Sequence, residues 1–514
     1  MNGKTSDADS GDIIKLAATV LGMATASFLF MMLNESDITF KEFPFDDAWI
    51  HLVYVRGWLR DGLPTYNPTI KESGFSSPLW LIAAMPAYLL STCALPLVLL
   101  VKMTGALFGA VAAFGAALLT HRLTRRLTAS ISTVALIYLW PAFGFSAVSG
   151  MEVTLTAACL VWAVHLFSSR KYAGSGLLIA LACLARPESA AALLAMLAIL
   201  AMRHSSRALR PGLYLLLPSV VLGATWLGYN TLAFGHPLPN TFYVKADLDL
   251  LRNLRYVLPQ VWLGDTPAFP ILATLLLGAG LVRLRPRSTL SPELKRALIE
   301  ILAVAVAGLL AVFLSRPVFK YITFFQQRYY TPYAFLLFPL LGVFLDTEDI
   351  LPLSRVVRRI VMASFMAAGA ISMLQARAVY WEHCQEIHTL HTQPALLIRE
   401  KTEPDAVIAV EGAGAMRYHS DRFTIDILGL NHHEIAHADN ARFLCILKRE
   451  NPTIVAVPTA FNRNLSQFFH LRPLAVFSVE HSHFTAHRGP RTLSIFAASL
   501  RSTVGAHCDG ARHQ

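Results

Sequence analysis

Long apolar runs separated by short polar joints occupy most of the chain up to residue 374. A helix that crosses a bilayer needs about 20 apolar residues, and a helix that lines a cavity can be shorter. The run at 78–92 contains Pro86, so we expect a half-inserted or surface helix there rather than a crossing. The other runs predict about eleven transmembrane helices, at 13–33, 97–120, 130–145, 152–168, 175–185, 188–202, 212–234, 268–282, 297–315, 332–345 and 355–374.

The pattern changes after residue 380, where the chain becomes polar and short apolar segments are separated by turns and one helix-like stretch, 441–451. Short segments of this kind are typical of β-strands. The sequence therefore predicts a mainly α, polytopic membrane protein, with a membrane domain at 1–378 that includes an external loop at 34–77, and a small C-terminal α/β domain at 379–514. The predicted strands are DAVIAV (405–410), FTIDIL (423–428), TIVAV (453–457), LAVFSV (474–479) and TLSIFA (492–497).

Composition and charge support this interpretation and give it an orientation. Of the 514 residues, 54% are hydrophobic and only 15% are charged, which lies outside the range of ordinary soluble domains. The net charge of +11 would suggest nucleic acid in a soluble chain, but no nucleic-acid motif accompanies it, and we expect no such partner. Basic joints are typical of the cytoplasmic side, which places the N-terminus inside and the C-terminal domain outside. These joints are 121–130, 168–175, 203–211, 283–296 and 354–359.

Two adjacent carboxylates, Asp46 and Asp47, stand in the external loop within FPFDDAWIH. The residues that follow suit an amphipathic helix lying along the membrane, with Asp46 or Asp47 capping its N-terminus. A carboxylate at the membrane boundary is suited to accept a proton from a hydroxyl or to hold a divalent cation such as Mg²⁺, Mn²⁺ or Ca²⁺. The alternative is a helix cap without chemistry.

Several motifs, taken in order, resemble those of one family. They are DDAWIHLVYVRGWLRDGLPTYNPT (46–69), ESGFSSPLW (72–80), SGMEVTL (149–155), ARPES (185–189), YNTLAFGHPLPNTFYVK (229–245), QRYYTP (327–332) and EPDAVIAVEGAGAMRYHSDRFTIDILGL (403–430). Together they resemble the polytopic GT-C glycosyltransferases, and among these the mycobacterial terminal arabinofuranosyltransferases.

This resemblance implies an enzyme of the bacterial inner (plasma) membrane that moves a sugar from a polyprenyl-phosphate donor to a hydroxyl of an envelope glycan or lipid acceptor, with inversion. A pentose such as arabinofuranose is one candidate sugar. An Asp of the first external loop is taken as the general base in such enzymes, which points to Asp47 or Asp46, with Asp47 favoured. The family commonly has Glu-Gly followed by an aromatic residue, whereas this chain has ESGF at 72–75, with one residue more between Glu and Gly. The resemblance therefore does not by itself assign a role to Glu72.

Other candidate residues lie in the joints that the topology places outside. Arg186, Arg328, Lys245 and His236 are cations that could bind the departing phosphate, and Arg is better suited than Lys to bidentate contact. The alternative for each Arg is a side chain that reaches toward water from the membrane. The remaining candidates for sugar or acceptor binding are His51, Glu72, Glu152, Glu188, Tyr229, Asn240, Tyr243, Tyr329, Tyr330 and Asp426.

Several of these residues also have structural alternatives. Glu152 and Glu188 begin predicted helices, where an acid complements the helix dipole. The tyrosines could be interface anchors, and Asp426 could form a structural turn. The tail is rich in histidine, but none of its His clusters has Cys at a structural-zinc spacing, so we assign no metal site.

Two other functions fit parts of the pattern. A transporter or flippase of polyprenyl-linked glycans would use the loop carboxylates as gates, but such proteins carry ionisable groups at mid-membrane depth, and here Lys102 is the exception in nearly uncharged runs. A periplasmic binding module on a membrane anchor would not need eleven crossings. The clustering of polar motifs on one side favours the enzyme.

Overall fold

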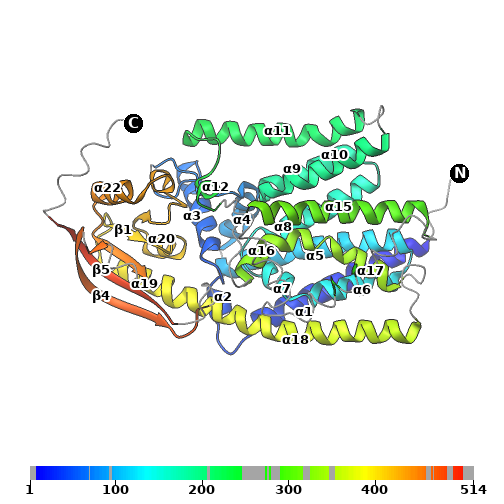
Figure 1. Cartoon of the computed structure of the whole chain (residues 1–514). Helices are drawn as coiled ribbons and strands as arrows, with labels where there is room; N and C mark the ends of the chain where they lie inside the picture. Colours follow the sequence, from blue (N-terminus) through cyan, green and yellow to red (C-terminus); the bar gives the residue numbers. More distant parts are fainter. Residues whose placement is uncertain are drawn as a thin grey trace. The chain divides into compact units, whose positions relative to one another are not determined.

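The computed structural model describes residues 7–68, 70–91, 95–204, 209–245, 273–274, 277–278, 290–315, 324–346, 354–458, 465–466, 468–482 and 490–501. The chain forms two compact units, each assembled from separate stretches of sequence (Figure 1). Unit 1 comprises Met1–Glu35, Val101–Ala224 and Asp247–Tyr380, and unit 2 comprises Ser36–Leu100, Thr225–Ala246 and Trp381–Gln514.

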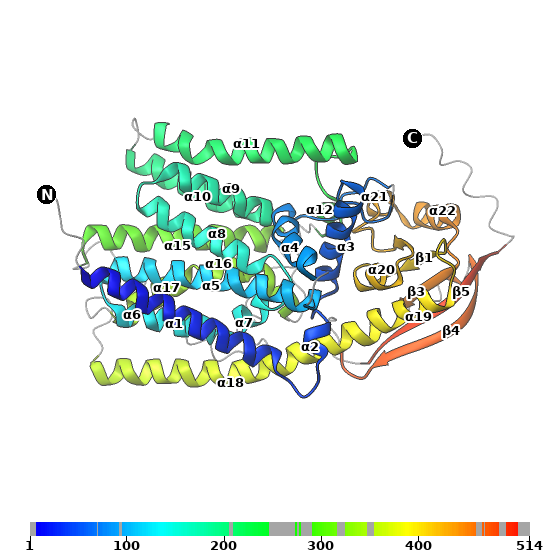
Figure 2. The same cartoon turned by 180° about the vertical axis from the view of Figure 1, so that it is seen from behind.

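Unit 1 is helical. Helix α8 packs against α9, α10 against α15, and α6 against both α1 and α17 (Figure 2). Helices α5, α11 and α18 each begin or end beyond the unit. The helices are α1 (Asp7–Met32), α5 (Leu97–Thr124), α6 (Leu127–Tyr138), α7 (Pro141–Ala147), α8 (Val153–Ser168), α9 (Tyr172–Ala185), the 3₁₀ turn η1 (Pro187–Ser189), α10 (Ala190–His204), α11 (Leu209–Phe234), α15 (Pro292–Ser315), α16 (Phe324–Ala334), α17 (Leu337–Asp346) and α18 (Arg355–Ile387).

Several of these helices are long and apolar enough to cross a membrane. Within the described ranges, five helical stretches are long and apolar enough to cross a bilayer, and counting each of two bent helix pairs as one span gives up to seven. The shorter apolar helices include α8 and α9. Ten of the eleven predicted runs coincide with helices, and the run at 268–282 lies outside the described residues apart from 273–274 and 277–278.

Two of the predicted runs are each divided between two helices. The run at 130–145 is divided between α6 and α7, which are bent by 70°, and the run at 332–345 is divided between α16 and α17, which are bent by 63°. Pro141 and Pro339 lie in the first turns of α7 and α17, where the missing backbone N–H of proline costs little. Interior prolines also occur within continuous helices, as with Pro86 in α4.

Unit 2 combines helices with one five-stranded sheet in the order β2-β1-β3-β5-β4. Strand β1 pairs in parallel with β2 and β3, and β5 pairs antiparallel with β3 and β4. All five predicted strands are confirmed: β1 (Val407–Val410), β2 (Phe423–Asp426), β3 (Ile454–Pro458), β4 (Phe469–Val479) and β5 (Arg491–Leu500). The helices are α2 (Ile38–Lys41), α3 (Asp46–Asp61), α4 (Pro78–Ser91), α12 (Asn240–Lys245), the π turn η2 (His388–Thr392), α19 (Gln393–Lys401), α20 (Ala415–Ser420), α21 (His433–Ala436) and α22 (Asn440–Glu450).

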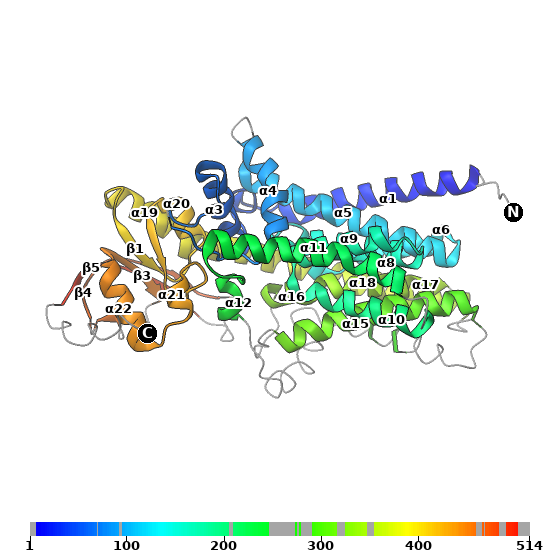
Figure 3. The ribbon, with the colours of Figure 1, turned by 90° about the horizontal axis from the view of Figure 1, so that it is seen from above.

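Alternate strand residues point to opposite faces of the sheet. Strands β1, β2 and β3 are buried on both faces, whereas the edge strand β4 is largely exposed. Ile408 and Val410 of β1 pack with Ile398 of α19 on one face, and Ala409 packs with Leu447 of α22 on the other. Figure 3 shows α19 and α22 on opposite sides of the strands. The C-terminal part is therefore a three-layer α/β/α sandwich.

Unit 2 is larger than the predicted domain at 379–514, because it also takes in 36–100 and 225–246. Side chains of the external loop form hydrogen bonds with backbone groups of the C-terminal part of unit 2. The side chain of Asn67 accepts a hydrogen bond from the Thr424 N–H (3.0 Å) and donates one to the Thr424 carbonyl (2.9 Å), at the free edge of β2. The Tyr66 hydroxyl donates to the Ala413 carbonyl (2.6 Å).

Candidate active site

The two adjacent carboxylates lie inside the first turn of α3. The N-cap position belongs to Phe45, and no side chain caps the helix there. The expectation that Asp46 or Asp47 caps α3 is therefore wrong, because both residues are already helical. Acidic residues in a first turn still stabilise the positive end of the helix dipole.

Asp46 caps a different helix. Its Oδ2 accepts a hydrogen bond from the Gly414 N–H (2.7 Å) and its Oδ1 accepts one from the Ala415 N–H (2.8 Å), at the start of α20. His391 Nδ1 lies 3.3 Å from Oδ1. A Cβ at Gly414 would lie only 2.1 Å from the Asp46 carbonyl oxygen, so this close approach requires glycine. Both oxygens of Asp46 are thus engaged by the C-terminal part of unit 2.

The Asp47 side chain points in a different direction from that of Asp46. Successive helical residues project about 100° apart, so Asp47 does not share the direction of Asp46 toward α20. Its side chain is partly exposed. His51 follows one turn later on the same face of α3 and is 7% exposed. The helix therefore presents the Asp46 carboxylate to α20 and the Asp47 carboxylate beside it, and both are partly exposed.

Glu42 fixes the approach to α3 and was missed from the sequence. It is fully buried, and its Oε1 accepts hydrogen bonds from the Phe43 N–H (3.1 Å) and from the Trp49 indole N–H. Its Oε2 accepts one from the Thr392 hydroxyl (2.6 Å), and His388 Nδ1 lies 3.6 Å away. The available signal was an acid directly before the aromatic stretch FPF at 43–45.

A second cluster brings together four predicted residues around α21. Glu72 Oε2 accepts a hydrogen bond from the His433 N–H (3.0 Å), and His433 Nδ1 lies 2.9 Å from the Asn240 Oδ1. The rings of His236 and His433 are stacked, with centroids 3.6 Å apart. Burial and the neighbouring histidines lower the pKa of His433 to about 4. Tyr243 reaches the same cluster through the ring of His437, at 4.5 Å.

Asp426 has a structural environment. It is fully buried at the end of β2, where it accepts hydrogen bonds from the Leu428 N–H and from the N–H and side-chain amide of Asn431, each at 2.9 Å. Burial raises its pKa to about 6. Gly429 lies in the turn that these bonds close, with φ +77°. The contacts fit the structural alternative for Asp426.

In unit 1 two buried arginines flank one aromatic ring. Arg186 forms an ion pair with Glu152 (2.7 Å), and its guanidinium carbon lies 5.0 Å from the centroid of Tyr329. Arg328, 1% exposed, lies at the same distance from that ring and donates to the Tyr329 hydroxyl (3.1 Å). Neither arginine reaches toward water. The motif QRYYTP was expected in a joint, but it lies within α16, which places Arg328 inside a helix.

The remaining predicted residues are more scattered. Glu188 lies in η1, and Tyr330 lies in α16. Tyr229 stacks on Trp226, 5.7 Å between centroids. The side chain of Lys245 and the histidines at 483 and 487 lie outside the described residues. Lys102, which was not assigned a role, is fully buried with its ammonium 5.1 Å from the centroid of the Tyr380 ring, and a lone lysine in an apolar run was the signal for it.

The residues that the structure describes do not offer a complete cation site. No three His, Cys, Asp or Glu side chains among them are grouped so that they could hold a metal ion. Of the two carboxylates expected to accept a proton or to hold a cation, Asp46 accepts hydrogen bonds from backbone N–H groups at both oxygens.

Replacing Asp46 by Asn is expected to lower the free energy of unfolding by about 1–2 kcal/mol, the usual effect of losing a helix cap. An amide offers only one acceptor oxygen, so one of the two N–H groups at α20 loses its partner. Thermal unfolding of the purified protein in detergent measures this change. Asp47→Asn is the matched control, and an equal loss in both variants would contradict a distinct capping role for Asp46.

Replacing Glu72 by Gln is expected to flatten the dependence of stability on pH. Burial raises the pKa of Glu72 from 4.5 to about 8, so the folded protein holds a proton that the unfolded chain releases. The stability that this bound proton gives to the folded protein is therefore fully present below the unfolded pKa of about 4.5, and it is lost as the pH rises toward 8. Between pH 5 and 8 the wild-type Tm should therefore decrease more steeply with pH, or increase less, than the Tm of the Glu72→Gln variant. In both proteins the raised pKa of Asp426 contributes a falling slope and the lowered pKa of His433 a rising one.

Glu434→Gln is the control for this measurement. Glu434 lies on α21 and its pKa is lowered by the hydrogen bond from Arg449 (3.0 Å), so it titrates below this pH range. Equal slopes for wild type and Glu72→Gln would contradict the assignment.

The fold of this chain resembles those of several solved membrane proteins. The structure resembles ArnT from Cupriavidus metallidurans bound to undecaprenyl phosphate, with a TM-score of 0.62, 12% sequence identity and coverage of 94% of this chain and 98% of ArnT. It also resembles the oligosaccharyltransferase of Archaeoglobus fulgidus in the apo form (TM-score 0.56, 12% identity, 87% of this chain and 70% of that chain). A structure of AglB from the same organism with an inhibitory peptide and a dolichol-phosphate gives a TM-score of 0.51 at 12% identity, covering 86% of this chain and 70% of that chain.

ArnT and AglB are GT-C glycosyltransferases, and the predicted GT-C fold is confirmed. Residues 377–496 match a family model described as a domain of unknown function, DUF8728. No curated protein matches the chain in sequence. The narrower resemblance to arabinofuranosyltransferases stays a prediction.

Proposed function

We propose that this chain, which has the GT-C fold, is a membrane glycosyltransferase that moves a sugar from a polyprenyl-phosphate donor to a hydroxyl of an envelope glycan or lipid acceptor. One observation carries the proposal: two partly exposed carboxylates, Asp46 and Asp47, lie in the first turn of α3. The backbone of α20 donates hydrogen bonds to both oxygens of Asp46, so we assign the base to its neighbour Asp47. Such a carboxylate, held on a rigid helix, is suited to general-base catalysis.

In the proposed reaction, the Asp47 carboxylate accepts the proton of the acceptor hydroxyl. The hydroxyl oxygen forms a bond to the anomeric carbon of the donor sugar while the bond from that carbon to the phosphate oxygen breaks. The electron pair of the broken bond stays with polyprenyl phosphate, which departs as a monoester with one more negative charge. Attack from the face opposite the phosphate inverts the anomeric centre.

Asp46 is a positioning residue in this proposal. Its two hydrogen bonds join the first turn of α3 to the first turn of α20, and the Glu42 contacts with Trp49 and Thr392 hold the same helix one turn further along. A base must stand within hydrogen-bond reach of the proton that it accepts, and small displacements reduce the rate strongly.

Arg186 and Arg328, the cations predicted to bind a phosphate, lie in unit 1 on either side of Tyr329. Guanidinium groups bind phosphate oxygens through paired hydrogen bonds, and such bonds are strengthened in a buried setting. The similar structures support this substrate class, since ArnT was solved with undecaprenyl phosphate and AglB with a dolichol-phosphate. A pentose such as arabinofuranose is the proposed sugar, and the outer face of the plasma membrane the proposed site of transfer.

The experiment is a transfer assay with a panel of radiolabelled polyprenyl-phosphate sugars, including arabinofuranose, on membranes that contain the overproduced protein. We expect one donor to label an envelope acceptor, with no label in membranes that lack the protein. A parallel series with a chelator tests whether Mg²⁺, Mn²⁺ or Ca²⁺ is required. Absence of protein-dependent transfer from every donor would contradict the proposal.

A further inference from the structure

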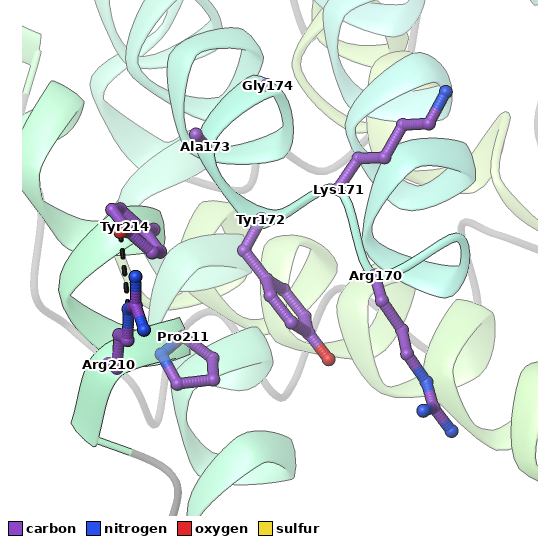
Figure 4. Close-up of a pocket in the computed structure, with 8 residues that line it drawn as sticks. All are labelled: Arg170, Lys171, Tyr172, Ala173, Gly174, Arg210, Pro211 and Tyr214. Carbon is purple, nitrogen blue, oxygen red and sulfur yellow. Dashed lines mark hydrogen bonds between the residues drawn. The ribbon is translucent and has the colours of Figure 1, made fainter.

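A cavity of about 370 Å³ lies in unit 1 where α8 turns into α9 and α11 begins (Figure 4). It has no part in the chemistry proposed above. Its eight lining residues include three cations, two tyrosines and no carboxylate. They are Arg170, Lys171, Tyr172, Ala173, Gly174, Arg210, Pro211 and Tyr214.

The side chains form a basic, hydroxyl-bearing rim. Arg210 Nε donates a hydrogen bond to the Tyr214 hydroxyl (3.3 Å), which leaves the hydroxyl hydrogen and the terminal guanidinium N–H groups of Arg210 able to donate to an anion. Figure 4 shows the Tyr172 ring between Arg210 and Arg170, with the Tyr172 hydroxyl and the Arg170 guanidinium on the same side. Both arginines are exposed.

The backbone adds to this preference for anions. Lys171 is the N-cap of α9 and makes no side-chain capping hydrogen bond. The first N–H groups of a helix have no partner within the helix and favour negative charge. Residues 172–174, which carry these groups, line the cavity.

Arg170 occupies a costly backbone position. Its φ is +59°, a conformation that favours glycine, in the turn between α8 and α9. Such positions are kept when the side chain or the turn serves a purpose. An arginine at this position supplies a cation at the mouth of the cavity.

The position of the cavity along the helices indicates where its ligand comes from. The apolar span of α11 begins at Leu209, so Arg210 and Tyr214 lie in its first turns, and the apolar helix α9 begins at Tyr172. The end of a spanning helix is the level at which lipid headgroups lie, and basic residues there attract anionic lipids.

We propose that this cavity binds the headgroup phosphate of an anionic membrane phospholipid. Arg170 and Arg210 contact the phosphate oxygens, Tyr172 and Tyr214 donate hydroxyl hydrogen bonds, and the acyl chains lie along the apolar part of α11. The site is independent of the proposed glycosyltransferase reaction.

The test is native mass spectrometry of the full-length protein in detergent, titrated with phosphatidylglycerol or with zwitterionic phosphatidylcholine. We expect preferential retention of phosphatidylglycerol. The double variant Arg170→Gly with Arg210→Ala should bind it about 10-fold to 30-fold more weakly, since each cation near the membrane contributes about 1 kcal/mol. Arg359→Ala, which removes an exposed arginine from the start of α18, should bind within twofold of wild type.

Arg170→Gly relieves the backbone conformation, so its Tm should not be lower than that of wild type, which separates lost binding from lost folding. Should the double variant not fold, Tyr172→Phe and Tyr214→Phe serve in its place, each with weaker retention. Equal retention of both lipids, wild-type retention by the double variant, or displacement of phosphatidylglycerol by equimolar inorganic phosphate would overturn the proposal.

Discussion

Replacing Asp47 by Asn is expected to reduce sugar transfer by about 10²–10⁴-fold, the usual contribution of a general base. Asn keeps the size of the side chain but cannot accept the proton of the acceptor hydroxyl. The helix should be retained, because Phe45 and not Asp47 occupies the N-cap of α3. The turnover number of the variant in nanodiscs, with the donor that the panel identifies, measures the effect.

Asp61→Asn is the matched control, because it makes the same chemical change at the other end of α3. The Asp61 carboxylate accepts hydrogen bonds from Arg60 (2.8 Å) and from the Thr65 hydroxyl (2.6 Å) and has no role in the proposed chemistry. Its turnover should stay close to that of wild type. Full activity of Asp47→Asn, with activity lost only in Asp46→Asn, would assign the base to Asp46.

Replacing Arg186 by Ala is expected to lower the free energy of unfolding by about 3–5 kcal/mol, the usual cost of removing one partner of a buried ion pair. Arg186 and Glu152 have side chains only 4% and 5% exposed, with 2.7 Å between Nη2 and Oε1. The variant leaves the Glu152 carboxylate buried without this cation. Thermal unfolding in detergent, with Tm read against wild type, measures the loss.

A double-mutant cycle separates the ion pair from the packing of each side chain. Glu152→Gln keeps the shape of the partner, so Arg186→Ala should be less harmful in that background than in the wild type. Additive effects of the two substitutions would contradict a direct coupling. Arg186→Lys keeps the charge and should recover part of the stability, but not paired phosphate contacts.

Helices and strands were largely predictable because apolar patterning determines which segments are buried. The strands at 407–410 and 454–458 show this, since short apolar segments between turns can be buried in a sheet that is covered on both faces. The breaks at 139–140 and 335–336 were not predicted, because the apolar pattern continues across them and only the prolines mark the change of direction.

The pairing within the candidate site was less predictable. Asp46 is held by Gly414 and Ala415, which lie 368 and 369 residues further along the chain, and no local pattern specifies such a contact. The same holds for the hydrogen bond between Glu72 and His433. The sequence showed which side chains carry suitable chemistry, whereas the fold was needed to show which carboxylate caps a helix.

The most direct test of the central claim is the stoichiometry of the reaction in proteoliposomes that contain only this protein, a labelled polyprenyl-phosphate sugar and an acceptor. We predict that one polyprenyl phosphate is released for each sugar joined to the acceptor, and that Asp47→Asn stops both. Movement of the label to the opposite leaflet with the sugar still attached to its lipid would contradict the account and would favour a flippase.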